Sequence, residues 1–293
     1  MTSTWSLLAL DLDGTLLGPE GGISIANASV MHQLRTLGLQ HIVATGRCRN
    51  ETLHALKPLG YQGGVIGASG AILSDFESGK TLHRITIPPS DVERIVGHVS
   101  ACGHLAHVLK DHQETGYDYL LVGTSSLHPV SKWWMESMDI SVKHVELIED
   151  DPDPDHTLRV GGIGEQEDIG HVTARIESDS ALDISLQQWG AVTSSHAIGS
   201  PIHIVETFGR SVGKWSMILH HCMLNGLDPD RVAAIGDGLN DVDMLTNAAY
   251  GIAMANAEEE VRTSADHVAG HHAEDGFAHA VRSLMKLETS LSP

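Results

Sequence analysis

The chain has 293 residues, of which 41% are hydrophobic and 19% are charged, a balance typical of a soluble globular protein. This length allows a large core and favours two domains. The formal net charge of −20 argues against nucleic acid or an anionic membrane surface as a partner, because both carry charge of the same sign. An anionic substrate would therefore need local cations and backbone dipoles to hold it.

The cysteines and the first residues indicate the compartment. Cys48, Cys102 and Cys222 are widely spaced and form no CxxC pair, which is typical of a reduced protein without a disulfide framework. Residues 1–6 contain no basic side chain, and two aspartates interrupt the apolar stretch that follows. We therefore expect neither a signal peptide nor a membrane span, and a cytoplasmic location. The sequence sets no oligomeric state.

The first part of the chain alternates strands and helices. Residues 5–10 are a short apolar run that predicts a buried strand. The helix that follows is expected to end at Gly38, a good C-terminal cap. Val30, Leu34 and Leu37 are predicted to form its apolar face.

Two further strands are expected at residues 41–44 and 64–67, separated by a helix that ends near Gly60. The order strand, helix, strand, helix, strand implies parallel pairing with right-handed crossovers. The predicted fold class is therefore α/β, with a doubly wound, Rossmann-like parallel sheet.

The rhythm changes after residue 85. Ser90 and Glu93 have the spacing of a capping box and predict the start of a helix that ends near Gly103. A second helix is expected near residues 165–178. Short strands are expected at residues 104–109, 117–122, 157–162, 181–187, 191–195 and 201–207.

Residues 149–155 are acidic and rich in proline, which predicts a surface loop. Together these elements form an α+β insert with an alternation of its own. We assign residues 1–85 and 209–293 to the core and residues 86–208 to an inserted cap domain.

The last third of the chain returns to the first rhythm. Met217, Ile218 and Leu224 predict a helix, which Gly226 would end. Asn256, with a glutamate three residues later, predicts the opening of another helix. The remaining elements are strands at residues 231–235 and 251–254, an edge strand at 267–269 and a final helix at 274–287.

The most informative motif is Asp11-Leu12-Asp13-Gly14-Thr15, which places two carboxylates one residue apart at the end of a strand. Extended chain alternates its faces with period two, so Asp11 and Asp13 would start on the same side. Two like charges so close repel unless a cation or a shared proton compensates them. Mg²⁺ is the hard cation that fits oxygen ligands beside phosphate. A solvated turn is the alternative interpretation of these residues alone.

Four segments follow predicted core strands: residues 11–15, 45–47, 67–70 and 236–241. Open α/β sheets bind ligands in the crevice at that edge. Thr45-Gly46-Arg47 combines a hydroxyl, a backbone N–H and a guanidinium, all groups that bind phosphate. The alternative for this tripeptide is a helix cap with a surface arginine.

The second half of the chain adds two further signals. Lys214 lies at the start of a helix, where a cation opposes the macrodipole, which indicates an anion to hold. A merely solvated lysine is the alternative. Gly236-Asp237-Gly238-Leu239-Asn240-Asp241 uses two glycines for a tight turn and presents Asp237 and Asp241 around Asn240.

In order and spacing, these segments closely resemble motifs one to four of the haloacid-dehalogenase superfamily of phosphotransferases. The motifs are Asp11-Leu12-Asp13-Gly14-Thr15, Thr45, Lys214 and Gly236-Asp237-Gly238-Leu239-Asn240-Asp241. The large insert resembles the type IIB cap of the Cof-like phosphatases. Ser69-Gly70 stands where many relatives have Asn-Gly, a departure that concerns a contact on the substrate side.

The resemblance implies a role for each motif residue. Asp11 would attack phosphorus and form an aspartyl-phosphate, and Asp13 would act as general acid and then as general base. The implied ligands of Mg²⁺ are Asp11, the backbone carbonyl of Asp13, and Asp237, with Asp241 in support. The implied residues that bind phosphate or substrate are Thr45, Gly46, Arg47, Lys214 and Asn240.

The expected activity is Mg²⁺-dependent hydrolysis of a small phosphorylated metabolite, such as a sugar phosphate. A phosphosugar mutase or another phosphotransferase is an alternative, because an aspartyl-phosphate serves either fate. A non-catalytic sensor of a phosphorylated ligand is a second alternative, which the intact Asp11 and Asp13 disfavour.

Overall fold

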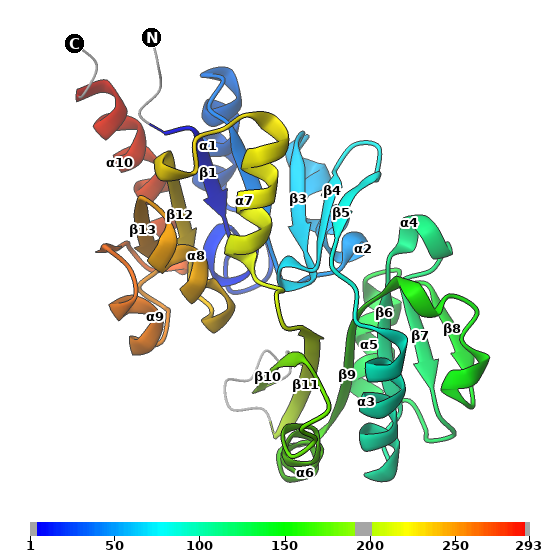
Figure 1. Ribbon diagram of the computed structural model, residues 1–293. Coiled ribbons are helices and arrows are strands. Elements are labelled where there is room, and N and C mark those ends of the chain that lie inside the picture. Colours follow the sequence, from blue (N-terminus) through cyan, green and yellow to red (C-terminus); the bar gives the residue numbers. More distant parts are fainter. Residues whose placement is uncertain (1–4, 191–200, 291–293) are drawn as a thin grey trace. The chain divides into compact units, whose positions relative to one another are not determined.

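The computed structural model describes residues 5–190 and 201–290, and the chain divides into two compact units (Figure 1). The first unit comprises Met1–Arg47, Thr52–Lys80 and Gly213–Pro293, and the second comprises Cys48–Glu51 and Thr81–Val212. The strand expected at residues 191–195 lies outside the described residues. The role of the inserted segment as a cap stays a prediction.

A mostly parallel sheet forms the centre of the first unit, in the order β14-β13-β12-β1-β2-β3-β4. Each neighbouring pair in this series is parallel except β3–β4, which is antiparallel. Because β1 lies between β12 and β2, the strand order reverses there, which confirms the predicted doubly wound sheet. The strands are β1 (Leu7–Leu10), β2 (His41–Ala44), β3 (Gly64–Gly67), β4 (Ile72–Asp75), β12 (Val232–Gly236), β13 (Tyr250–Ala253) and β14 (His267–Val268).

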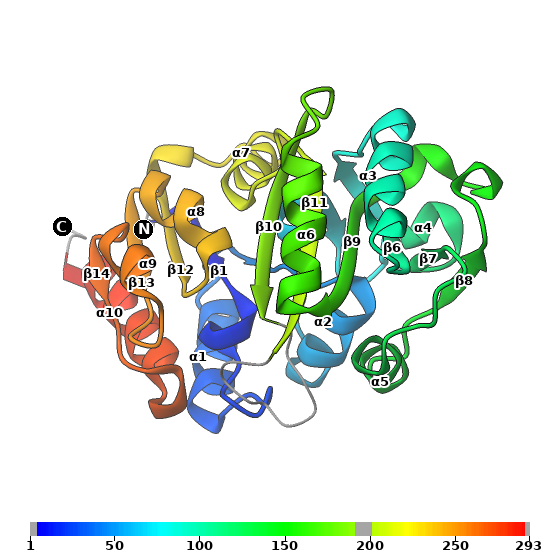
Figure 2. The same ribbon diagram turned by 90° about the horizontal axis from the view of Figure 1, so that it is seen from below.

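Helices cover both faces of this sheet (Figure 2). Helix α1 packs with α10 on one face, and α7 packs with α8 on the other. All four residues of β1 are buried, because a central parallel strand is covered from both sides, and such strands read as continuous apolar runs. The helices of this part of the chain are α1 (Ile25–Thr36), α2 (Arg49–Leu56), α7 (Lys214–Asn225), α8 (Val242–Asn247), α9 (Glu259–Thr263) and α10 (Gly276–Ser290).

The predicted apolar faces of α1 and α7 are correct except at their ends. Leu37 and Leu224 are 64% and 52% exposed, whereas Leu34 and Ile218 are fully buried. Leu37 follows the last residue of α1 and leaves the buried stripe. Leu224 lies six residues after Ile218, which turns its side chain by roughly 240° about the helix axis, away from the core.

The second unit has a six-stranded sheet in the order β10-β11-β9-β6-β7-β8. Helices α3 and α6 lie along one face of it (Figure 2), where Val96, Val99 and Val172 join the apolar side chains of the strands in one core. The strands are β6 (Ala106–Lys110), β7 (Tyr119–Val122), β8 (Val142–Val145), β9 (Thr157–Glu165), β10 (Ile184–Gly190) and β11 (Ile202–Gly209), and β5 (Thr81–Arg84) opens the long segment of this unit. Its helices are α3 (Pro89–Ala101), α4 (His112–Thr115), α5 (Pro129–Ser137) and α6 (Gln166–Glu177).

Two predicted helix starts are wrong. Helix α3 begins at Pro89, and no side chain caps it, so Ser90 is not the capping residue. Proline at the first helical position sets the start earlier, because its fixed φ suits the helix. Helix α9 has Glu258 rather than Asn256 before its first residue. In the described part of the chain, no helix has the length and apolarity that a membrane crossing needs.

Candidate active site

The predicted site residues all belong to the first unit, and the sheet brings them to one edge. Asp11 follows β1, Thr45 follows β2 and Asp237 follows β12. These three strands are parallel neighbours, with Leu10 opposite both Ile235 and Val43, so their carboxyl ends lie together. The site therefore lies in the first unit, where the strand order reverses.

A tight turn after β1 presents the first motif. Gly14 has a φ of 70°, in the left-handed region that favours glycine. A Cβ atom at this position would lie 2.0 Å from Oδ2 of Asp237, so a side chain is excluded on that ground as well. The next residue, Thr15, donates from Oγ1 to Oδ1 of Asp237 at 3.1 Å. The turn thus packs directly against the motif that follows β12.

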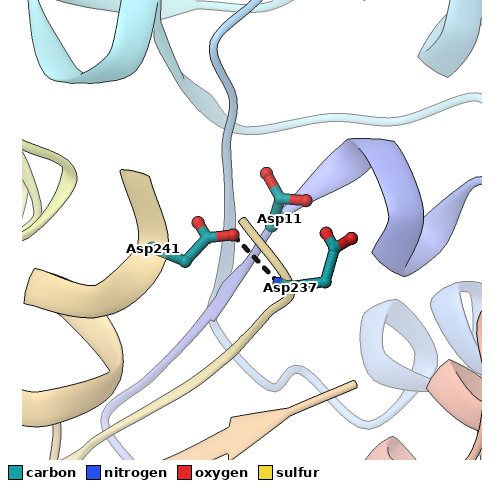
Figure 3. Close-up of side chains that lie close together, drawn as sticks. All are labelled: Asp11, Asp237 and Asp241. Atoms are coloured by element: carbon teal, nitrogen blue, oxygen red, sulfur yellow. Dashed lines mark hydrogen bonds between the residues drawn. The ribbon is translucent and has the colours of Figure 1, made fainter. Parts of the chain in front are cut away.

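Three carboxylates meet at this edge (Figure 3). Asp11, Asp237 and Asp241 each offer one oxygen, and these oxygens lie within 4.8 Å of one another. Asp11 and Asp241 are 4% and 0% exposed. Such closely spaced buried carboxylates repel unless a cation balances them.

Lys214 supplies part of that balance from the first position of α7. Its Nζ donates to Oδ1 of Asp11 at 2.6 Å and to Oδ1 of Asp241 at 2.5 Å, and its side chain is fully buried. Burial by itself lowers the pKa of the ammonium, but the two carboxylates outweigh that effect, so the pKa is raised above its usual value. Lys214 is therefore charged in the folded protein.

Asp241 is engaged through both oxygens. Besides the contact with Lys214, its Oδ2 accepts hydrogen bonds from the backbone N–H of Asp237 at 3.0 Å and of Gly238 at 2.8 Å (Figure 3 shows the first of these). The carboxylate thus closes the turn after β12 and orients Lys214. The carboxylate of Asp237 lies beside that of Asp11.

The electrostatics of the group favour a divalent cation. Burial and then the Asp241 carboxylate raise the pKa of Asp237 to about 7. The pKa of Asp11 is also raised, by burial and by Asp241, although Lys214 acts in the opposite direction. Three carboxylates beside one ammonium leave an excess of negative charge, and all the atoms that could bind a cation are oxygens. This set fits Mg²⁺, a hard cation that prefers carboxylate ligands.

Four of the five residues predicted to bind phosphate, namely Thr45, Gly46, Arg47 and Asn240, lie beside one another. Thr45 is fully buried, and its Oγ1 accepts from the backbone N–H of Arg47 at 3.2 Å. The backbone N–H of Ser69 donates to the Thr45 carbonyl at 3.0 Å, and Nδ2 of Asn240 approaches Oγ of Ser69 at 3.4 Å. A Cβ atom on Gly46 would be 3.4 Å from both of these side-chain atoms. The structure thus brings together residues 45–47, Ser69 and Asn240, which follow β2, β3 and β12.

Asp13 and Arg47 form a pair of their own. The Arg47 guanidinium donates from Nε to Oδ2 of Asp13 at 2.8 Å and from Nη2 to Oδ1 at 2.6 Å. The Asp13 side chain is 56% exposed, in contrast to the buried Asp11. Its carboxylate is therefore not a member of the three-carboxylate group, and the fork of Arg47 fixes its orientation.

Asn256 is a further residue of this site, although its local pattern predicted a helix cap. The side-chain amide donates from Nδ2 to the Gly14 carbonyl and to Oδ2 of Asp237, each at 2.9 Å. A signal was available, because Asn256 follows β13, the parallel neighbour of β12. The rule that placed Asp237 at the carboxyl edge applies to this segment as well.

Comparison with known proteins identifies the family. The sequence profile of the haloacid dehalogenase-like hydrolases matches residues 8–281. The chain belongs to this family. It is 25% identical over 298 residues to the phosphatase YwpJ of Bacillus subtilis, which covers 95% of this chain and 99% of that protein.

Several solved structures have the same fold as this haloacid dehalogenase-like (HAD-like) hydrolase. A haloacid dehalogenase-like hydrolase from Bacteroides thetaiotaomicron has a TM-score of 0.78 and 21% identity, covering 96% of this chain and 99% of its own. A HAD subclass IIB sugar phosphatase has a TM-score of 0.75 and 21% identity, with 95% and 98% covered. The resemblance to the type IIB architecture that the sequence indicated is thereby confirmed.

The raised pKa of Asp237 predicts how pH affects the stability of the metal-free HAD-like hydrolase. Between its unfolded value of about 3.9 and its folded value of about 7, the folded state holds a proton that the unfolded state has lost. The contribution of this group to the free energy of unfolding is therefore lost as pH rises through about 7. Melting in EDTA should show wild type losing stability relative to Asp237→Asn between pH 5 and pH 8. A difference that stays constant over this interval would contradict the assignment.

Proposed function

We propose that this hydrolase is a Mg²⁺-dependent phosphomonoesterase that acts on a small phosphorylated metabolite, such as a sugar phosphate. The observation that carries the proposal is the placement of Asp11 beside Asp237 and in contact with Lys214. A nucleophile, a set of cation ligands and a buried positive charge thus stand together. The phosphatase activity named for the relative YwpJ supports the same class of reaction.

The proposed reaction has two displacements at phosphorus. A carboxylate oxygen of Asp11 attacks, the bond from phosphorus to the alcohol oxygen breaks, and the carboxylic acid of Asp13 donates its proton to that oxygen. Water then attacks the aspartyl-phosphate while the Asp13 carboxylate accepts a proton from it. The bond to Asp11 breaks and inorganic phosphate leaves.

The surroundings of Asp13 suit the role of general acid and base. Its carboxylate is exposed, so a leaving group and water can reach it, whereas Asp11 is buried beside the charges that stabilise attack. Arg47 holds both oxygens of Asp13, which makes it a positioning residue for the acid and base. The two aspartates therefore have separate tasks because their environments differ.

The phosphoryl oxygens are assigned to four groups: the Thr45 hydroxyl, the Gly46 N–H, Lys214 and Asn240. The backbone N–H of Arg47 donates to Oγ1 of Thr45, so the hydroxyl hydrogen of Thr45 is left to point at an oxygen of the substrate. The ammonium of Lys214 offsets negative charge on the transferring group. Positioning and neutralisation of charge supply most of the catalysis in such a transfer.

Mg²⁺ would be held by Asp11, the backbone carbonyl of Asp13, and Asp237, with Asp241 supporting the site through Lys214 and the turn. When bound, the cation would supply charge neutralisation between the carboxylates and the phosphate. We assign the choice of substrate to the inserted segment, since every residue given a role in phosphoryl transfer lies in the first unit.

The test is phosphate release from a panel of phosphorylated metabolites, with Mg²⁺ and with excess EDTA. We expect release from at least one sugar phosphate, without a bisphosphate activator, and its loss in EDTA. Isomerised product in place of free phosphate would instead identify a mutase. Full turnover in EDTA would contradict the metal assignment, and binding of phosphorylated compounds without turnover would identify a sensor.

A further inference from the structure

Asn256 occupies a central place among the segments of the site. Its Nδ2 donates to the Gly14 carbonyl and to Oδ2 of Asp237, and its Oδ1 accepts from the backbone N–H of His272 at 3.1 Å. One half-buried side chain thus joins the turn after β1, the turn after β12 and the segment after β14.

The partners determine how the amide is oriented. The N–H of His272 can only donate, so the amide oxygen must face it. The Gly14 carbonyl can only accept, and so can the Asp237 carboxylate in the ionised form that would bind a cation, so both hydrogens of the amide nitrogen are used there. The reversed amide would place oxygen against two acceptors, which the network forbids.

The amide also separates two acceptors that the fold brings close together. Asp237 packs so tightly over Gly14 that a Cβ atom there would lie 2.0 Å from its carboxylate. Asn256 supplies a hydrogen to the Gly14 carbonyl and another to Oδ2 of Asp237, while Thr15 binds Oδ1. Each oxygen of Asp237 thus has one fixed donor, which restrains its rotation.

We propose that Asn256 is a positioning residue for the divalent cation, because it holds the Asp237 carboxylate against the Asp11–Thr15 turn. This inference rests on the proposed function. The side-chain hydrogen bonds of Asn256 go to protein groups, so this residue acts through Asp237 rather than on the substrate. Partners that orient a metal ligand in this way contribute about 10–100-fold to metal affinity.

The experiment compares Asn256→Ala and Asn256→Ser with a matched control, Asn27→Ala. Asn27 is a buried amide that likewise bridges two backbone groups, donating to the Leu16 carbonyl at 2.9 Å and accepting from the N–H of Ala278 at 3.2 Å. Both of these hydrogen bonds go to backbone groups outside the proposed metal site, so losing them affects stability without releasing Asp237. Each full-length protein is titrated with Mn²⁺ by electron paramagnetic resonance and with Mg²⁺ by calorimetry, without substrate at pH 8.

We expect the dissociation constant for Mn²⁺ and Mg²⁺ to rise about 10–100-fold in both Asn256 variants and to stay unchanged in Asn27→Ala. Phosphatase activity of the Asn256 variants should recover as Mg²⁺ is raised, which a general structural defect would not allow. Wild-type affinity in a folded Asn256 variant would overturn the inference. Failure of both variants to fold would make Asn256 a structural residue and overturn it as well. Absence of metal binding by the wild type would instead overturn the proposed function.

Discussion

Replacing Asp11 by asparagine is expected to lower turnover by about 10⁴-fold or more while the protein stays folded. The amide is nearly isosteric with the carboxylate but is a poor nucleophile. The substitution also removes one of three closely spaced like charges, and the pKa of Asp11 is raised because burial disfavours its charged form. We therefore expect the metal-free variant to melt no lower than wild type at pH 8.

The measurement is a single-turnover assay of phosphate release, combined with thermal melting of the same samples. Acid quenching of the wild type with a labelled substrate should trap phosphate on Asp11, and the variant should trap none. Turnover of Asp11→Asn at the wild-type rate would show that no covalent intermediate forms on this residue.

Replacing Lys214 by methionine is expected to damage both stability and activity. The substitution leaves Asp11 and Asp241 buried without their shared cation, and breaking a buried ion pair costs about 3–5 kcal/mol in the free energy of unfolding. It also removes the charge that we assign to the transferring phosphoryl group. Turnover should therefore be lost even under conditions in which the variant is folded.

Lys110→Met is the matched control. Lys110 is 2% exposed, and its Nζ binds Oδ2 of Asp151 at 2.5 Å and Oγ1 of Thr157 at 2.8 Å, all within the second unit. We expect a comparable loss of stability by urea denaturation, with the kcat of the folded fraction retained. Equal kcat in both folded variants would mean that Lys214 has a structural role alone.

Most of the sheet could be predicted because its strands are short apolar runs, and glycine, proline or charged residues mark the ends of these runs. The strand expected at residues 64–67 coincides with β3, and the predicted edge strand lies at the end of the sheet as β14. The antiparallel strand β4 was missed, since Ile72–Asp75 is a short run without a clear alternation. Local pattern identifies a strand when burial demands apolar residues on both of its faces.

Helix boundaries were less predictable, because several local signals compete for the same few residues. Ser90 and Glu93 have the spacing of a capping box, but the helix starts earlier at Pro89. Asn256 has a similar local pattern, yet its amide binds Asp237 instead of a helix terminus. A polar side chain close to a helix start caps it only if no stronger partner lies within reach.

The amino-acid sequence by itself indicated most residues of the candidate site, though not Asn256, because the carboxylates, glycines and lysine that phosphoryl chemistry needs stand directly beside predicted strands and helix starts. Tertiary structure alone decided how they pair: Asp13 with Arg47, 34 positions apart, Asp11 with Lys214, 203 apart, and Gly14 with Asn256, 242 apart. Spacing along the chain sets the local turn, whereas the order of parallel strands sets which turns become neighbours. The partners of each charge, and hence its pKa, follow from that order.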